Sequence, residues 1–157
     1  MRIGLLSRSG EIYSTRRLRE AAESRGHEVL VADPGRCALG VGAEGRSINY
    51  RGIELVGFDA VIPRVATSTN SYGSAVVRQF DLAGVFCLNR AGPIALARDK
   101  LVCAQMLSAA GVDIPRTAFA HSPRYAEDLV RMVGGPPVVI KVLEGTQGVG
   151  VLLADSL

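Results

Sequence analysis

The stretch RIGLL at residues 2–6 is an apolar run of strand length, and it ends in a turn cluster at residues 7–10 (SRSG). Further runs of this kind follow at residues 27–32 (HEVLVA), 59–63 (DAVIP) and 85–88 (VFCL). Between these runs, apolar residues recur at helical spacing over residues 14–25 and 72–83. Ser14 or Thr15 is the expected N-cap of the first helix. This alternation predicts an α/β fold with a parallel, doubly wound sheet of the Rossmann type.

A Gly-rich segment interrupts the alternation at residues 36–57, where short apolar runs around Ile48 and Ile53 predict an inserted hairpin. The segment contains Gly40-x-Gly42-x-x-Gly45, which matches the dinucleotide-binding fingerprint. That fingerprint requires a first strand-to-helix turn, whose helix N-terminus receives the pyrophosphate. Here the run follows the second strand and precedes another, so we interpret it as a loop and disfavour a Rossmann-type oxidoreductase.

The pattern changes after residue 92. Helices are expected over residues 93–97 and 99–110, and a further helix begins at Ser122-Pro123. Strands are expected over residues 116–120, 138–143 and 151–154, with a Gly-rich loop before the last. We therefore divide the chain into a domain at residues 1–92 and an incomplete α+β subdomain at residues 93–157.

Composition excludes several classes of protein. A hydrophobic content of 48% with 21% charged residues excludes a disordered chain, and the longest uncharged stretch, residues 65–77, is too polar for a membrane helix. A net charge of +3 without interleaved aromatics argues against direct nucleic-acid binding. Three widely spaced cysteines predict free buried thiols in a reducing cytoplasm. With two histidines and no P-loop or clustered ligands, neither P-loop chemistry nor a His-based metal site is indicated.

Lysine is rare in this chain. Sixteen of the eighteen basic residues are Arg, and the two lysines are Lys100 and Lys141. Lys100 opens an expected helix, and Lys141 ends an apolar run before the Gly-rich loop at 145–150, so both lie where a phosphate is favoured. A solvated helix-end charge and a lysine extending from a hairpin are the structural alternatives.

The combined motifs resemble the first half of an ATP-grasp ligase. These motifs are RDK at residues 98–100, PVVIK at 137–141 and EGTQGVG at 144–150. Similarity to the RimK family in particular comes from the opening strand and helix, from FDAVIPR at 58–64 and from AHSP at 120–123. The resemblance covers the whole chain and implies a Rossmann-like pre-ATP-grasp domain followed by the first ATP-grasp subdomain. It also implies ATP-dependent ligation, in which a substrate carboxylate is phosphorylated and an amine attacks the acyl phosphate.

The resemblance assigns roles to particular residues. Lys100 and Lys141 match the ATP-contacting lysines of the family, and the loop with Gly145, Thr146, Gln147, Gly148 and Gly150 matches its lid over the phosphates. Ser7, Arg8, Arg64 and Asn89 follow strands at the sheet edge where α/β proteins bind ligands, and we assign them to the carboxylate-bearing substrate. Hydrogen bonding within the fold accounts equally well for Ser7 and Asn89.

The family also implies partners. They are ATP, Mg²⁺, glutamate and the C-terminal tail of a small-subunit ribosomal protein, without a membrane or direct nucleic-acid contact. The Mg²⁺ ligands belong to a second half with no counterpart here, so we expect this chain to be inactive alone and to have an uncovered apolar face that permits homo-oligomers. Alternatives are a non-catalytic nucleotide- or protein-binding module, or a related ligase of amino-acid or cofactor biosynthesis.

Overall fold

The computed structural model describes residues 1–43, 45–65, 70–143 and 150–156. The chain divides into two compact units, Met1–Ala95 and Leu96–Leu157. No helix in the described ranges is long and apolar enough to cross a membrane.

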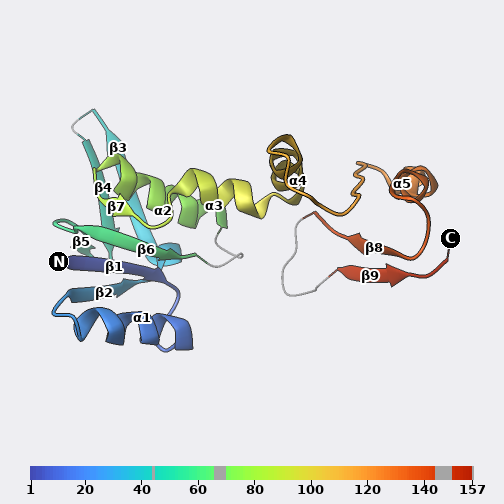
Figure 1. Cartoon of the computed structure of the whole chain (residues 1–157). Helices are drawn as coiled ribbons and strands as arrows, with labels where there is room; N and C mark the ends of the chain where they lie inside the picture. The colour runs from blue at the N-terminus through green and yellow to red at the C-terminus, as the bar shows by residue number, and fades with distance from the viewer. Residues whose placement is uncertain (44, 66–69, 144–149, 157) are drawn as a thin grey trace. The chain divides into compact units, whose positions relative to one another are not determined.

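A four-stranded parallel sheet organises the first unit. Its strands are β1 (Arg2–Ser7), β2 (Glu28–Ala32), β6 (Ala60–Arg64) and β7 (Phe86–Cys87), in the order β2-β1-β6-β7. Helix α1 (Tyr13–Glu23) packs against β1 and β2, and α2 (Asn70–Leu82) packs against β6 and β7 on the opposite face (Figure 1). The predicted doubly wound α/β fold with a parallel sheet is confirmed.

The insertion between β2 and β6 is a second, antiparallel sheet. A short 3-10 helix, η1 (Pro34–Arg36), leads into β3 (Cys37–Gly42), β4 (Gly45–Tyr50) and β5 (Ile53–Glu54). The insertion therefore has one strand more than the predicted hairpin. The glycine run of the apparent dinucleotide fingerprint lies along β3 and at the start of β4, so its interpretation as a loop is wrong. The run does not open a helix.

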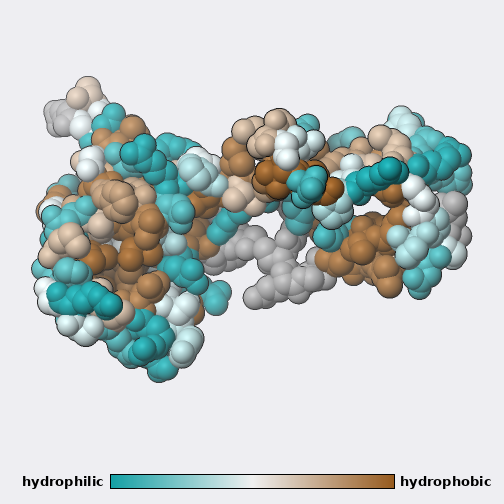
Figure 2. Space-filling view, viewed as in Figure 1, coloured by the Kyte–Doolittle hydropathy of each residue, from teal (hydrophilic) through white to brown (hydrophobic). Residues whose placement is uncertain are grey.

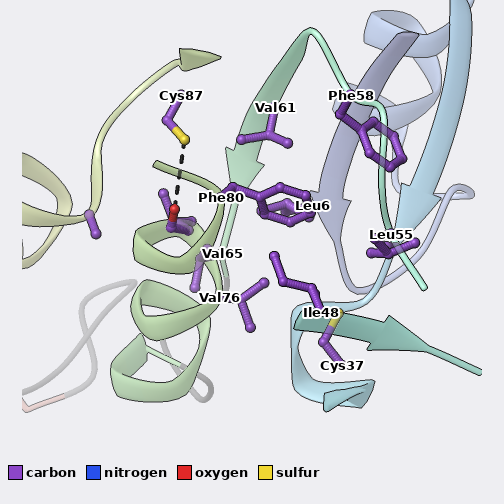
Figure 3. Close-up of a cluster of buried hydrophobic side chains, with 13 residues drawn as sticks. Leu6, Cys37, Ile48, Leu55, Phe58, Val61, Val65, Val76, Phe80 and Cys87 are labelled. Carbon is purple, nitrogen blue, oxygen red and sulfur yellow. Dashed lines mark hydrogen bonds between the residues drawn. The ribbon is translucent and has the colours of Figure 1, made fainter. Parts of the chain in front are cut away.

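Helix α2 is buried on two sides, because it contacts β6 and β7 of the parallel sheet and β3 and β4 of the insertion. Its apolar residues Val76, Val77 and Phe80 are at most 2% exposed. They form the centre of the hydrophobic core with Val61 of β6 and Ile48 of β4 (Figure 3). Helix α3 (Ala91–Arg98) adds Ala91 to this core and runs across the boundary between the units.

Two polar side chains of α2 hold the insertion in place. The Tyr72 hydroxyl donates to the Cys37 carbonyl oxygen at 2.8 Å. Farther along the helix, the Gln79 amide Nε2 donates to the carbonyl oxygens of Gly40 at 2.7 Å and Ser47 at 3.1 Å, one on each strand of the β3–β4 pair. These bonds satisfy polar groups that the packing against α2 removes from water.

The second unit contains α4 (Lys100–Ala109), the 3-10 helix η3 (Pro123–Tyr125), α5 (Ala126–Val133) and an antiparallel hairpin of β8 (Val138–Lys141) and β9 (Val151–Ala154). The strand predicted over residues 116–120 is wrong, since these residues have no strand partner in the part of the chain that the structure describes. Figure 2 shows apolar residues gathered over β8 and β9, where Leu152 and Leu153 are exposed.

The start of α1 also differs from the prediction. Neither Ser14 nor Thr15 caps the helix, whose N-cap residue is Ile12 without a side-chain cap. Both hydroxyls have other partners: Thr15 bonds to Ser7, and Ser14 accepts from Arg64. Long-range hydrogen bonds have replaced the local cap here.

We predict that Phe80→Ala lowers the free energy of unfolding of the first unit by about 3–5 kcal/mol, since it leaves a cavity between the two sheets. The matched variant is Leu82→Ala on the same helix, where the side chain is 56% exposed. It should change stability by no more than about 0.5 kcal/mol. Urea denaturation followed by circular dichroism measures both, and equal losses would contradict the proposed core.

Cysteine reactivity gives a second test. Burial, with a smaller contribution from Asp33, raises the pKa of the Cys37 thiol from 9.0 to about 11. Burial also raises the pKa of Cys87 to about 11, with Asp81 adding to the rise and Arg90 opposing it. The thiolate is the reactive form, so iodoacetamide near pH 8 should label Cys103 first and the two buried thiols about 100-fold more slowly.

Mass spectrometry of the labelled peptides checks this order, and early labelling of Cys37 or Cys87 would contradict it. Because both pKa values are raised in the folded protein, the neutral thiols are favoured. The free energy of unfolding that the neutral Cys37 and Cys87 thiols contribute should therefore be lost as the pH rises from 9.0 toward 11.

Candidate functional site

The β8–β9 hairpin places one of the two lysines beside the Gly-rich segment. Lys141 is the last residue of β8 and pairs with Val151 of β9. The Val142 amide then donates to the Gly150 carbonyl oxygen at 3.1 Å, which closes the base of the connection between the strands. The Lys141 side chain is exposed, so its ammonium is available to an anion at this end of the hairpin.

The other lysine reaches the same end of the hairpin. Asp99 caps α4 by accepting from the amides of Leu101 and Val102 at 3.0 and 2.9 Å, which fixes the backbone at Lys100. The Lys100 ammonium donates to the Leu143 carbonyl oxygen at 2.5 Å. Since Leu143 lies two residues after Lys141, the structure brings both predicted lysines to the point where the Gly-rich segment begins.

Gly150 ends this segment with a backbone that favours glycine. Its φ is +71°, and a Cβ added there would lie 2.7 Å from Cγ2 of Val142. The hairpin base thus requires a residue without a side chain. The remaining loop residues predicted to contact phosphate, Gly145, Thr146, Gln147 and Gly148, lie outside the described residues.

Polar residues also gather where β1 and β6 end. Ser7 and Arg64 are register partners on these neighbouring strands. The Ser7 hydroxyl is buried, lies 2.8 Å from the Thr15 hydroxyl and donates to the Ser9 carbonyl oxygen at 3.3 Å. The Arg64 guanidinium is exposed and donates to the Ser14 hydroxyl at 3.0 Å. Ser7 therefore has a structural role, whereas Arg64 presents a charge at the edge.

The other two predicted substrate residues are also near strand ends. Arg8 is exposed directly after β1, and Asn89 is exposed two residues after β7. The contacts of Ser14 with Arg64 and of the Leu143 carbonyl oxygen with Lys100 were not predicted from the sequence. At Ser14 the sequence indicated only a helix cap. The backbone carbonyl group of Leu143 is common to every residue type, so the sequence could not single it out.

In the part of the chain that the structure describes, no cluster of metal-ligating side chains accompanies these groups. In residues 1–43, 45–65, 70–143 and 150–156, no group of three or more His, Cys, Asp or Glu side chains is placed to hold a metal ion.

Solved structures define the class of this fold. The crystal structure of a RimK domain protein ATP-grasp from Sphaerobacter thermophilus superposes with a TM-score of 0.74 at 23% identity, over 99% of this chain and 55% of that one. The ATP-grasp ligase PsnB, complexed with a minimal precursor, gives a TM-score of 0.70 at 20% identity over 98% of this chain and 56% of PsnB. The chain has the fold of the corresponding part of ATP-grasp proteins.

Sequence comparison identifies the family. Residues 1–94 match the RimK PreATP-grasp domain, and residues 97–157 match the RimK-like ATP-grasp domain. The chain therefore belongs to the RimK family, as the sequence motifs predicted.

Curated relatives agree with this assignment. The probable alpha-L-glutamate ligase of Halorhodospira halophila is 53% identical over 156 residues, and that of Stutzerimonas stutzeri is 55% identical over the same length. Each alignment covers 99% of this chain and 52% of the relative. The chain thus spans about half the length of the curated relatives it matches.

We predict that Gly150→Ala opens the base of the hairpin, because the new methyl group combines an unfavourable φ with a clash against Val142. Gly111→Ala is the matched control, since Gly111 has the same φ of +71° with nothing within 4 Å of an added Cβ. Amide hydrogen exchange at Val142 should accelerate at least about tenfold in the first variant only, since the cost is about 1–2 kcal/mol or more. Equal exchange in both variants would contradict the clash.

Proposed function

We propose that this chain is the nucleotide-phosphate-binding part of an ATP-dependent carboxylate–amine ligase. The observation that carries the proposal is the bond between the Lys100 ammonium and the Leu143 carbonyl oxygen, at the hairpin end that also carries Lys141. Two ammonium groups at the start of a Gly-rich connection suit phosphate oxygens, which they neutralise as compact charges.

The reaction that fits this arrangement has two steps. The terminal phosphoryl group of ATP passes to a substrate carboxylate, and an amine then displaces phosphate to form an amide bond. Lys100 and Lys141 would hold the phosphate oxygens and stabilise the charge that develops during the first step. The predicted lid residues Gly145, Thr146, Gln147 and Gly148 would exclude water from the acyl phosphate.

The substrates are proposed from the relatives, which are named probable alpha-L-glutamate ligases. We propose glutamate as the amine and the C-terminal carboxylate of a small-subunit ribosomal protein as its acceptor, in the cytoplasm. The guanidinium of Arg64, together with Arg8 and Asn89 after the neighbouring strands, supplies groups of the kind that bind a carboxylate. Ser7 supports this edge through its bond to Thr15.

A non-catalytic nucleotide- or protein-binding module is the second candidate. In such a module, the exposed Lys141 and the Lys100 ammonium at the Leu143 carbonyl oxygen would bind phosphate without transferring a phosphoryl group. The two candidates differ in whether the chain completes a ligase when the rest of the family's ATP-grasp domain is supplied.

The test joins this chain to the remaining half of the Halorhodospira halophila relative. With ATP, Mg²⁺, glutamate and a peptide with a free carboxyl end, the fusion should release phosphate and lengthen the peptide. The 157-residue chain alone should do neither under the same conditions. A fusion that binds ATP without glutamate-dependent turnover would favour the binding module.

In the active fusion, Lys141→Arg should lower kcat/KM for ATP roughly 10- to 100-fold although the charge is kept, because a planar guanidinium cannot replace a compact ammonium between phosphate oxygens. Lys100→Arg should act in the same direction but more mildly. Arg131→Lys in α5, an exposed ion-paired position, is the matched control and should be neutral. Unchanged kinetics in both lysine variants would remove them from the phosphate site.

A further inference from the structure

A cleft of about 310 Å³ lies in the first unit, between β4, residues 54–58 and the C-terminal part of α2. Its position separates it from the strand-end residues considered above. Gly57 and Phe58 precede β6, and Val85 precedes β7, so the cleft lies at the amino-terminal edge of the parallel sheet. Ser7 and Arg64 lie at the carboxyl ends of β1 and β6.

The floor of the cleft is apolar and already packed. Ile48, Leu55, Phe58 and Phe80 line it and are each at most 8% exposed. The rings of Phe58 and Phe80 meet edge to face, with centroids 5.9 Å apart and planes inclined by 81°. Such a floor accepts an apolar side chain without first rearranging, and the volume suits a small ligand.

A polar side chain of α2 also lines this space. Gln79 lines the cleft, and its amide nitrogen is held by the carbonyl oxygens of Gly40 and Ser47. Within the described residues, the Oε1 atom of Gln79 receives no hydrogen bond. Gln79 is 6% exposed, and the two bonds to its nitrogen fix the orientation of its amide.

An exposed positive charge also lines the cleft. Arg46 lines the cleft and precedes Ser47, whose carbonyl oxygen holds the Gln79 amide. Alternation along β4 places Arg46 on the same face as Ile48, and Glu54, the register partner of Asn49, also lines the cleft. In the part of the chain that the structure describes, Arg46 has neither an ion pair nor a side-chain hydrogen bond.

We infer that this cleft binds a small organic acid that has a large apolar side chain and a hydrogen-bond donor on the carbon next to its carboxylate. Arg46 would bind the carboxylate, Gln79 Oε1 would accept from the adjacent hydroxyl or amino group, and the side chain would rest on Phe58 and Phe80. The inference does not depend on the proposed ligase function.

The experiment titrates the full 157-residue chain, labelled with ¹⁵N, with L-phenyllactate. Two matched probes are hydrocinnamate, which lacks the α-hydroxyl, and hydrocinnamyl alcohol, which also lacks the charge. Saturable amide shifts at Ser47, Gly57 and Ala83 are expected with L-phenyllactate. Binding should weaken about 2- to 10-fold for hydrocinnamate and a further 10-fold or more for the alcohol.

Variants assign the binding to this cleft. Arg46→Ala should weaken L-phenyllactate about 10- to 100-fold, whereas Arg78→Ala, an exposed arginine of α2 outside the cleft, should not change it. Ala83→Trp should abolish binding by filling the cleft, and it should preserve the fold because Ala83 is exposed. No saturable shifts up to about 10 mM, or equal affinity for all three probes, would overturn the proposal.

Discussion

The burial of one helix between two sheets determines the architecture of the first unit. Helix α2 presents Val76, Val77 and Phe80 to the core, and it contacts the parallel sheet and the β3–β5 insertion together. The apolar surface removed from water gives the packing its free energy, while Tyr72 and Gln79 satisfy carbonyl oxygens that this packing covers. The parallel sheet and the insertion are thereby held as one body, with a ligand-sized cleft at one end of the helix.

Much of this fold could be predicted from the sequence, because the central strand β1 is buried almost throughout and appears as a continuous apolar run. RIGLL and DAVIP became the neighbouring strands β1 and β6. Residues 116–120 were also expected to form a strand but have no partner strand among the described residues, and local sequence alone does not state whether a partner exists. The cap of α1 was mispredicted for a related reason, since Ser14 and Thr15 bond to residues distant in sequence.

The candidate phosphate site was predictable in part because lysine is so rare here. Because the chain has two lysines among eighteen basic residues, the positions of Lys100 and Lys141 indicated a candidate phosphate site. The structure places both lysines at one end of the β8–β9 hairpin. The partner of Lys100 could not be predicted, since a backbone carbonyl acts through its position and not through residue type. The cleft at Arg46 and Gln79 was likewise invisible, because its two polar groups are 33 residues apart and meet only through the fold.

The insertion also bears on the order in which the chain folds. The parallel strands β1 and β6 pair Ile3 with Ala60, so all of α1, β2 and the insertion lie in the intervening loop. Closing a long loop costs chain entropy, which slows folding when the contacts that reward it are distant in sequence. The β3–β5 sheet is antiparallel and connected by short turns, so it can form from local contacts. Once formed, it shortens the free chain between β1 and β6 and lowers the entropic barrier to completing the parallel sheet.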